Sequence, residues 1–271
     1  MSAADPTPAM SALELLGATF AGALGAMVTL WLVSLWLRDA SIVDLWWGPG
    51  FAAIAGWVFW LTGGDHPRRA LLLGLACLWG LRLGTYLLWR NAGHGEDHRY
   101  RAMRRRWGAR FPWVSLGTVF ALQGVLQWIV SLPLQLGQIS PGPPALGVLD
   151  ALGVLVFAVG LFFEVVGDLQ LARFKARSDS GGRVMDRGLW RYTRHPNYFG
   201  DFLVWWGIFI VTLATPLGAL AAPGPALMTV LLLRVSGVAH LERTIGRRRP
   251  DYAAYQACTS AFFPKPPRPR P

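Results

Sequence analysis

The stretch from Arg191 to Asp201 combines residue types that bind anions where a helix starts. Pro196 suits the first turn of a helix, where its missing N–H is no loss. Arg194 and His195 would then stand at the positive end of that helix, beside free backbone N–H groups. These residues favour an anion site at a membrane surface. The alternative is a basic collar that only contacts the membrane interface.

A second group of candidates consists of ionisable residues inside apolar segments. An ionisable side chain at bilayer depth costs several kcal/mol unless it is paired or hydrated, so each is a candidate for function. Asp44 begins the second apolar segment, and Arg82, Tyr86 and Arg90 recur every four residues on one face of the third. The others are Glu164, Asp168 and Lys175 in the fifth segment, Asp201 in the sixth, and Arg234, His240 and Glu242 near the end of the seventh.

These charged groups admit two interpretations. They can pair with one another and hold helices in register, and Asp44 in particular can cap its helix or pair with Arg82. Alternatively, they line a polar cavity open to the cytoplasm, which accounts for the whole set because most of them fall in one half of the membrane. No G-x-G-x-x-G after a strand and no P-loop motif is present, so a nucleotide would have to lie among helices and loops. Planar guanidinium groups suit a 2′-phosphate.

The composition is that of a membrane protein. The chain has 271 residues, of which 53% are hydrophobic and 15% charged, whereas soluble chains average roughly 25% charged residues. The formal net charge of +11 indicates loops that face anionic lipid, and not a nucleic-acid partner. Two distant cysteines and the absence of a Cys/His cluster argue against a disulfide framework and against a metal site.

The apolar pattern predicts an all-α integral membrane protein with seven transmembrane helices in a single domain, residues 1–271. A helix needs about 20 apolar residues to span a bilayer. The expected spans are 11–37, 42–61, 70–90, 115–136, 145–172, 198–215 and 220–241. Residues 245–271 form an Arg- and Pro-rich tail, whose aromatic residues can dock it back on the cytoplasmic face: Tyr252, Tyr255, Phe262 and Phe263.

The basic residues predict the orientation. Seven Arg or Lys lie in 90–110, seven in 173–194 and seven in 243–270, and with Arg38 they all follow odd-numbered spans. These segments therefore share one side, which the positive-inside rule makes cytoplasmic. The N-terminus is then expected outside and the C-terminus inside.

The segment Arg194-His-Pro-Asn-Tyr-Phe-Gly-Asp201, preceded by Gly188-Leu-Trp190, resembles the motif of membrane steroid 5-alpha-reductases and sterol reductases. Glu164-x-x-x-Asp168 with Lys175, and Tyr252-x-x-Tyr255 before Phe263-Pro264, resemble further parts of that pattern. The third-span residues and Gly95-Glu-Asp-His-Arg-Tyr100 resemble the bacterial branch. The resemblance covers roughly residues 40–265 and implies a seven-helix enzyme of a bacterial inner membrane.

The resemblance implies NADPH-dependent reduction of a hydrophobic enone, such as a 4-ene-3-keto steroid, in a cytoplasm-facing cavity covered by loops. Asn197 would hold the nicotinamide end, with Asp201 nearby. The other cofactor-binding residues carried over are Glu164, Asp168, Lys175, Arg194, His195, Tyr198, Arg234, His240 and Tyr252. Membrane lipid would be the other partner.

The chain departs from the family at the proton donor. Eukaryotic members polarise the ketone with a Gln-Glu pair on the second span and a Tyr on the third, and this chain has no Gln-Glu pair there. Asp44 and Tyr86 are the catalytic candidates that remain. A donor is needed because hydride attack on an enone builds negative charge on the ketone oxygen.

Two other functions share parts of the pattern. Membrane methyltransferases that use S-adenosylmethionine, such as those acting on isoprenylcysteine or phospholipids, also carry R-H-P-x-Y-x-G. The R-H-P-N-Y form made by Asn197 resembles the reductases, and the methyltransferases usually pair two late Glu residues where this chain has Glu242 alone. A lipid-binding or assembly protein would leave the buried ionisable groups with packing roles only.

Overall fold

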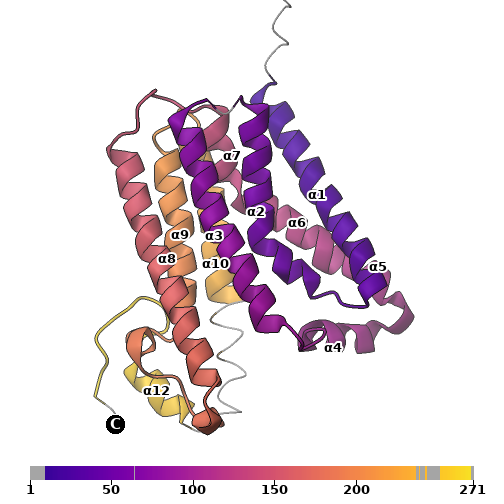
Figure 1. The fold of residues 1–271 in the computed structure, drawn as a ribbon, viewed down its shortest axis with the longest axis vertical. Helices are drawn as coiled ribbons and strands as arrows, with labels where there is room; N and C mark the ends of the chain where they lie inside the picture. The colour runs from indigo at the N-terminus through magenta and orange to yellow at the C-terminus, as the bar shows by residue number, and fades with distance from the viewer. Residues whose placement is uncertain (1–9, 64, 236–237, 239–241, 243–250, 270–271) are drawn as a thin grey trace, which may run out of the picture. The chain divides into compact units, whose positions relative to one another are not determined.

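The computed structural model describes residues 10–63, 65–235, 238, 242 and 251–269, and every regular element within these ranges is a helix. This confirms the predicted all-helical class. The chain divides into two compact units (Figure 1): unit 1 contains residues 1–147 and 212–224, and unit 2 contains residues 148–211 and 225–271. The single membrane domain expected from the sequence stays a prediction.

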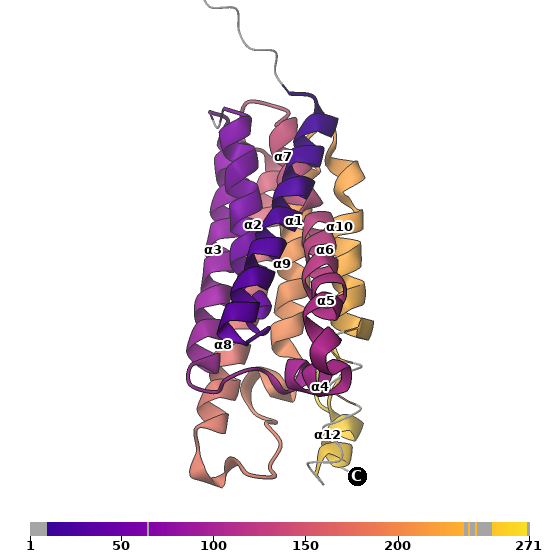
Figure 2. The same ribbon diagram turned by 90° about the vertical axis from the view of Figure 1, so that its right-hand side faces the viewer.

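Unit 1 begins with three long helices and continues with a chain of shorter ones. In α1 the Ser11 and Glu14 side chains form a capping box, in which each side chain bonds the other residue's backbone N–H. Helices α1 and α6 lie side by side in both views (Figures 1 and 2). The elements are α1 (Ala12–Leu37), α2 (Ile42–Leu61), α3 (Pro67–Asn91), α4 (His98–Trp107), α5 (Phe111–Ser115), a π-helical turn (Leu116–Ala121), α6 (Leu122–Val130) and α7 (Leu132–Ile139).

Helices α2 and α3 pack through glycines. A Cβ atom on Gly48 would lie 2.4 Å from the Gly80 carbonyl oxygen, and one on Gly84 would lie 2.6 Å from the Pro49 ring. Small residues of this kind let helix backbones approach closely, which favours packing in a membrane. The contact fixes α2, and with it Asp44 in its first turn, against α3.

Unit 2 is built on one long helix, α8 (Val148–Lys175), and on α9 (Pro196–Thr212), which begins at Pro196 as predicted. The last residue of α9 and the first two of α10 fall in unit 1. The remaining elements are two 3-10 turns (Ser178–Ser180 and Gly188–Arg191), α10 (Pro223–Val230), a π-helical turn (Leu231–Val235) and α12 (Tyr252–Cys258).

Glycines spaced by seven residues bring α8 and α9 together. A Cβ atom on Gly153 would lie 2.7 Å from the Gly207 carbonyl oxygen, and one on Gly160 would lie 2.6 Å from that of Gly200. At the next repeat Gly167 faces Pro196, where an added Cβ atom would lie 3.2 Å from the proline ring. The first turn of α9 is therefore held against the polar end of α8.

Six helical segments in the described ranges are long and apolar enough to cross a membrane: 12–37, 42–61, 67–91, 98–130, 148–175 and 218–235. This confirms an integral membrane protein. The expected sixth span corresponds to α9, whose 17 residues are fewer than the roughly 20 that a bilayer needs. The seven-span count, and the orientation that depends on it, stay predictions.

The fourth expected span, 115–136, differs at both ends. Helix starts earlier, at His98, because the Asp97 side chain accepts a hydrogen bond from the Arg99 backbone N–H at 2.8 Å and caps α4. Helix breaks at Ser131, before the proline in the first turn of α7.

Candidate functional site

The first turn of α9 meets two buried carboxyl groups of α8. Glu164 and Asp168 have only 4% and 6% of their surface exposed. The Asn197 amide nitrogen donates a hydrogen bond of 3.2 Å to the Asp168 carboxylate. Buried carboxylates need such partners, and the bond orients the Asn197 side chain with its own carbonyl oxygen left to accept from another group. The motif residue and the helix carboxylate thus form one polar cluster.

Arg194 and His195 share one carboxylate. The Arg194 Nε lies 2.7 Å from the Glu242 Oε1, and the His195 Nε2 lies 3.4 Å from the same oxygen. Burial alone would raise the pKa of Glu242, but the hydrogen bonds from His195 and Arg194 outweigh it and lower that pKa to about 2. Burial likewise opposes the charge of Arg194, and the Glu242 carboxylate reverses this effect and raises the arginine's pKa.

The C-terminal tail docks on the same stretch. The Arg194 backbone N–H donates to the Ser260 carbonyl at 2.9 Å, the Thr193 hydroxyl donates to the Phe262 carbonyl at 2.7 Å, and the Lys265 N–H donates to the Tyr192 carbonyl at 3.0 Å. The Tyr255 hydroxyl donates to the Trp190 carbonyl, and the Arg194 guanidinium also reaches the Thr259 carbonyl. Phe262 and Phe263 pack their rings against Phe199 and Phe202 of α9.

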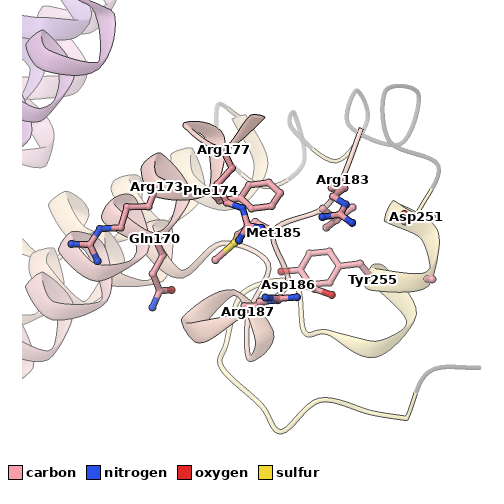
Figure 3. A pocket seen from close by; sticks show the side chains of 12 residues that line it. Gln170, Arg173, Phe174, Arg177, Arg183, Met185, Asp186, Arg187, Asp251 and Tyr255 are labelled. Carbon is pink, nitrogen blue, oxygen red and sulfur yellow. The ribbon is translucent and has the colours of Figure 1, made fainter. Parts of the chain in front are cut away.

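A pocket of about 560 Å³ lies at the far end of α8 (Figure 3). This volume is in the range of small-molecule sites. Four arginines line it against two aspartates, Asp186 and Asp251. Arg177 and Arg183 bind Asp179, whereas within the described residues neither Arg173 nor Arg187 has a carboxylate partner. The lining residues are Gln170, Arg173, Phe174, Arg177, Arg183, Val184, Met185, Asp186, Arg187, Asp251, Ala254 and Tyr255.

The Gln170 side chain joins the pocket wall to the 3-10 turn Gly188–Arg191. Its carboxamide oxygen accepts the Leu189 backbone N–H at 3.0 Å, and one turn back on α8 the Gly167 carbonyl accepts the Trp190 indole N–H at 3.0 Å. These bonds hold the 3-10 turn Gly188–Arg191 along α8. Gly188 has φ +59 and packs on Gln170, so a residue with a side chain would be strained there.

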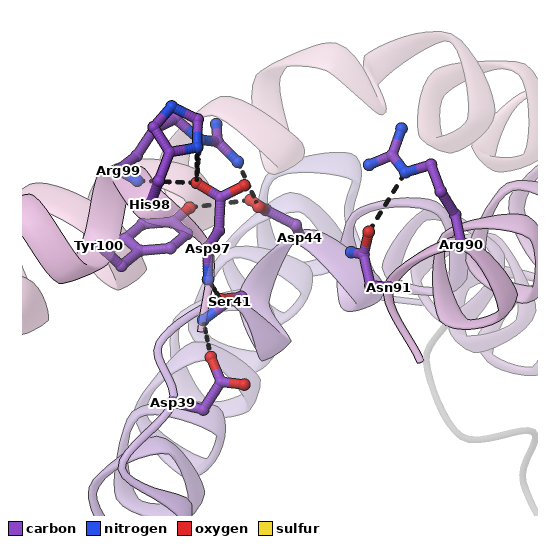
Figure 4. Close-up of polar contacts among 9 residues, drawn as sticks. All are labelled: Asp39, Ser41, Asp44, Arg90, Asn91, Asp97, His98, Arg99 and Tyr100. Carbon is purple, nitrogen blue, oxygen red and sulfur yellow. Dashed lines mark hydrogen bonds and ion pairs between the residues drawn. The ribbon is translucent and has the colours of Figure 1, made fainter. Parts of the chain in front are cut away.

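Unit 1 contains a separate polar cluster around Asp44 (Figure 4). Its carboxylate accepts hydrogen bonds from the Arg99 guanidinium at 2.6 Å and from the Tyr100 hydroxyl at 2.8 Å. The partner of Asp44 is therefore on α4, and the Ser41 backbone, not Asp44, occupies the cap position of α2. Tyr86 lies between the guanidinium groups of Arg82 and Arg90, at 5.4 and 5.7 Å from its ring centre.

Residues 30–259 match a family described as a protein of unknown function, DUF1295. The chain belongs to this family. An uncharacterized protein of Schizosaccharomyces pombe is 25% identical to this DUF1295 chain over 269 residues, which cover 87% of the chain and 76% of the relative.

Two plant proteins are similar over a shorter stretch. The steroid 5-alpha-reductase DET2 of Gossypium hirsutum is 35% identical over 60 residues, and that of Arabidopsis thaliana is 36% identical over 62 residues. Each match covers 22% of this chain and 23% of the plant protein, so the similarity to these reductases is local. No solved structure matches the DUF1295 chain.

The structure gathers most of the motif residues of this DUF1295 protein in unit 2. The Tyr198 ring stacks on the His195 ring, with their centres 5.5 Å apart, and the buried Tyr252 ring lies with its centre 5.9 Å from that of Tyr255. Lys175 is exposed at the end of α8, and Arg234 is exposed in the π-helical turn. Asp201 lies one turn after Asn197 on α9, and His240 lies outside the described residues.

The residues that make the pocket are not among the candidates predicted from the sequence. Among the described residues quoted for the family pattern, Tyr255 lines the pocket, but none of the cofactor-binding candidates does. Arg173, Arg177, Arg183 and Arg187 entered the prediction as part of the basic segment 173–194, whose guanidinium groups suit a phosphorylated nucleotide, and not as named site residues. Their clustering around the pair Gly181-Gly182 signals a turn that can fold arginines back on a helix. Whether any of these residues binds a cofactor stays a prediction.

Proposed function

We propose that this protein is an NADPH-dependent membrane reductase that saturates the carbon–carbon double bond of an enone lipid, with a 4-ene-3-keto steroid as substrate and the 5-alpha-dihydro ketone as product. One observation carries the proposal: α8 bears the Asp168–Asn197 contact and, five residues further along, Arg173 of the arginine-lined pocket. The local similarity to steroid 5-alpha-reductases supports the same activity.

The spacing along α8 suits an elongated ligand with a polar amide at one end and phosphates at the other. Asp168 and Arg173 are five residues apart on α8, which is about 8 Å along a helix at about 1.5 Å per residue. The other arginines of the pocket follow the end of α8 at Lys175. A dinucleotide has this form. The excess of arginine over aspartate in the pocket and the two arginines without a carboxylate partner in the described ranges fit its phosphates.

Each proposed role follows from the bonds that the side chain already makes. The Asn197 nitrogen is engaged by Asp168, so its carbonyl oxygen would accept from the carboxamide of the nicotinamide. Arg173 and Arg187 would hold phosphate oxygens, as charge-assisted donors do. The cofactor, when bound, would supply the hydride that adds to the enone β-carbon. The docked tail and its phenylalanines would exclude water from α9.

The ketone oxygen needs a donor for the negative charge that builds on it, and the α-carbon then takes a proton. Tyr86 can donate its hydroxyl proton directly. Asp44 accepts from Arg99 and Tyr100 in this structure, and a carboxyl group donates only while protonated. We therefore propose Tyr86 as the first donor candidate and Asp44 as the second.

The alternative activity is methyl transfer from S-adenosylmethionine. The late acidic residue that such an enzyme would use is Glu242, and here its carboxylate is engaged by Arg194 and His195. This arrangement favours a structural role for Glu242 and thereby the reductase.

Calorimetry on the purified protein in detergent separates the two activities. We expect NADPH to bind and S-adenosylmethionine not to bind. NADPH absorbance should then fall when a 4-ene-3-keto steroid is added. Binding of the methyl donor without binding of NADPH would refute the reductase, and NADPH binding without turnover of any such steroid would refute the proposed substrate.

A further inference from the structure

Helix α4 and the turn that follows it carry six arginines between residues 99 and 110, and five of them divide into two sets. The inner set is Arg99 and Arg104. Arg99 binds Asp44 and Asp97 at 2.6 and 2.9 Å. Arg104 donates two hydrogen bonds to Glu96, at 3.1 and 2.8 Å, and its guanidinium lies 4.3 Å from the centre of the Phe111 ring. Carboxylates of unit 1 therefore neutralise the charge of this set.

The inner face of α4 is anchored by apolar contacts as well. Tyr100 is only 6% exposed, and Met103 packs with it against a hydrophobic cluster that includes Met27, Trp31 and Phe120. At 3.6 residues per turn, positions 100, 103, 104 and 107 share one face of the helix, and positions 101, 105 and 106 lie away from it. The helix therefore has a fixed outward face.

The outer set, Arg105, Arg106 and Arg110, is exposed on that outward face and in the turn after it. Among the residues that the structure describes, no carboxylate pairs with any of the three. Arg101 is exposed beside them, and its charge acts on Glu96. Three exposed guanidinium groups within six residues, without a protein counter-charge in the described ranges, form a surface for an external anion.

The position of α4 identifies the anion's source. It lies at the end of unit 1 where α1 ends and α2 begins (Figures 1 and 2). Two contacts agree with this position: Arg99 of α4 binds Asp44 in the first turn of α2, and Glu96, which binds Arg104, also accepts the Ala40 backbone N–H between α1 and α2. The apolar part of the fourth candidate span follows immediately. Trp107 is 39% and Trp113 72% exposed at this junction. Exposed tryptophans mark the headgroup level of a bilayer.

We propose that the outward face of α4 is a binding surface for anionic phospholipid headgroups. Arg105, Arg106 and Arg110 would donate to the headgroup phosphates, while Trp113 of α5 sits among the glycerol and upper acyl groups. A basic helix with flanking aromatic residues has this use at membrane surfaces. The surface is independent of the reductase activity proposed above.

The test uses the full chain in detergent micelles, titrated with phosphatidylglycerol or with phosphatidylcholine and followed by native mass spectrometry. We expect phosphatidylglycerol to bind at least fivefold more tightly. The triple variant R105Q/R106Q/R110Q should lose about fivefold per arginine, on the order of a hundredfold in all, and R105K/R106K/R110K should keep most of the affinity. All three positions are exposed, so the melting temperature in phosphatidylcholine should not change.

A matched control removes the same charge elsewhere. R187Q/R191Q/R268Q takes three exposed arginines from unit 2 and should keep the phosphatidylglycerol affinity within twofold. The proposal is overturned if this control loses as much as the α4 variant, because net charge alone would then explain binding. Equal affinity for phosphatidylcholine, or full competition by inorganic phosphate at equal concentration, would overturn it as well.

Discussion

Two segments of this protein, residues 99–110 in unit 1 and 173–187 in unit 2, are both rich in arginine but have different surroundings. On α4 the inner arginines are neutralised by Asp44, Asp97 and Glu96, and the outer ones are exposed. In unit 2 the arginines come from a helix and a returning loop and surround a pocket (Figure 3). We propose that positive charge serves attachment to a membrane surface in the first case and enclosure of a ligand in the second.

The carboxylates of the two segments follow the same logic. Burial alone would raise the pKa of Glu96, but hydrogen bonds from Arg104 and the Ala40 N–H lower it below its usual range. At the surface of unit 2, hydrogen bonds from Arg177 lower the pKa of Asp179. Both acids are charged at neutral pH and cancel nearby arginines. The arginines proposed to bind an external ligand are those without such a partner in the described ranges.

The sharpest test of the enclosing role of unit 2 is Asn197→Ala. The variant removes the amide that Asp168 orients, and we expect the reduction rate to fall at least about a hundredfold, equivalent to about 2.7 kcal/mol. Steroid-dependent NADPH oxidation measures it. Tyr198→Phe keeps the ring that stacks on His195 and measures separately what the hydroxyl of this carried-over cofactor residue contributes. Near-wild-type activity in Asn197→Ala would remove that residue from the site.

The arginine comparison itself is tested by a pair of double variants. R173Q/R187Q should weaken NADPH binding about 10- to 100-fold, because each charge-assisted hydrogen bond contributes about 1.5–3 kcal/mol and solvent screens part of that at exposed side chains. R105Q/R106Q removes the same charge from α4 and should leave NADPH affinity unchanged. Calorimetric titration of both reports the difference. Equal losses would mean that net charge, and not the pocket, attracts the cofactor.

The packing that shapes unit 2 is tested by Gly160→Ala. The new Cβ would lie 2.6 Å from the Gly200 carbonyl oxygen, so α8 and α9 must separate, at a cost of about 1–3 kcal/mol. Gly25→Ala on α1 has nothing within 4 Å of the added atom and should be neutral or slightly stabilising. Melting temperatures in one detergent compare the two. A Gly160→Ala protein as stable as Gly25→Ala would show that α8 and α9 do not need this close approach.

Apolar length and proline placement were enough to predict the long helices, because burial in a bilayer and the geometry of proline act locally. The second span was predicted at 42–61, where α2 lies, and α9 begins at Pro196 as expected. The Glu164–Asp168 face of α8 followed from helical spacing, and both side chains are buried.

Contacts between distant segments were not accessible in the same way. Asp44 and its partner Arg99 are 55 residues apart, and no local rule distinguishes that pair from one with Arg82. The 98–107 segment is so rich in arginine that its helical form depends on the Asp97 cap and on burial of Tyr100. The Arg-lined pocket depends on how the 178–191 loop returns to α8. Hydrogen bonds to backbone carbonyls, such as those that dock the tail, cannot be predicted from the order of side chains because every residue has a carbonyl group.

The smallest expected effect concerns Glu242, which anchors the motif in unit 2. Its folded-state pKa of about 2 lies below the ordinary 4.5, so it stabilises the fold fully above pH 4.5 and loses that contribution as the pH falls toward 2. Because the carboxylate is partly exposed, we expect about 1 kcal/mol. Glu242→Gln should therefore melt lower than wild type at pH 7, and the gap should narrow between pH 4.5 and 3. Asp65→Asn, at an exposed ion pair of unit 1, should show little gap at either pH. If the difference in melting temperature between Glu242→Gln and wild type stays constant with pH, the shape of the Glu242 side chain, and not its charge, holds Arg194 and His195.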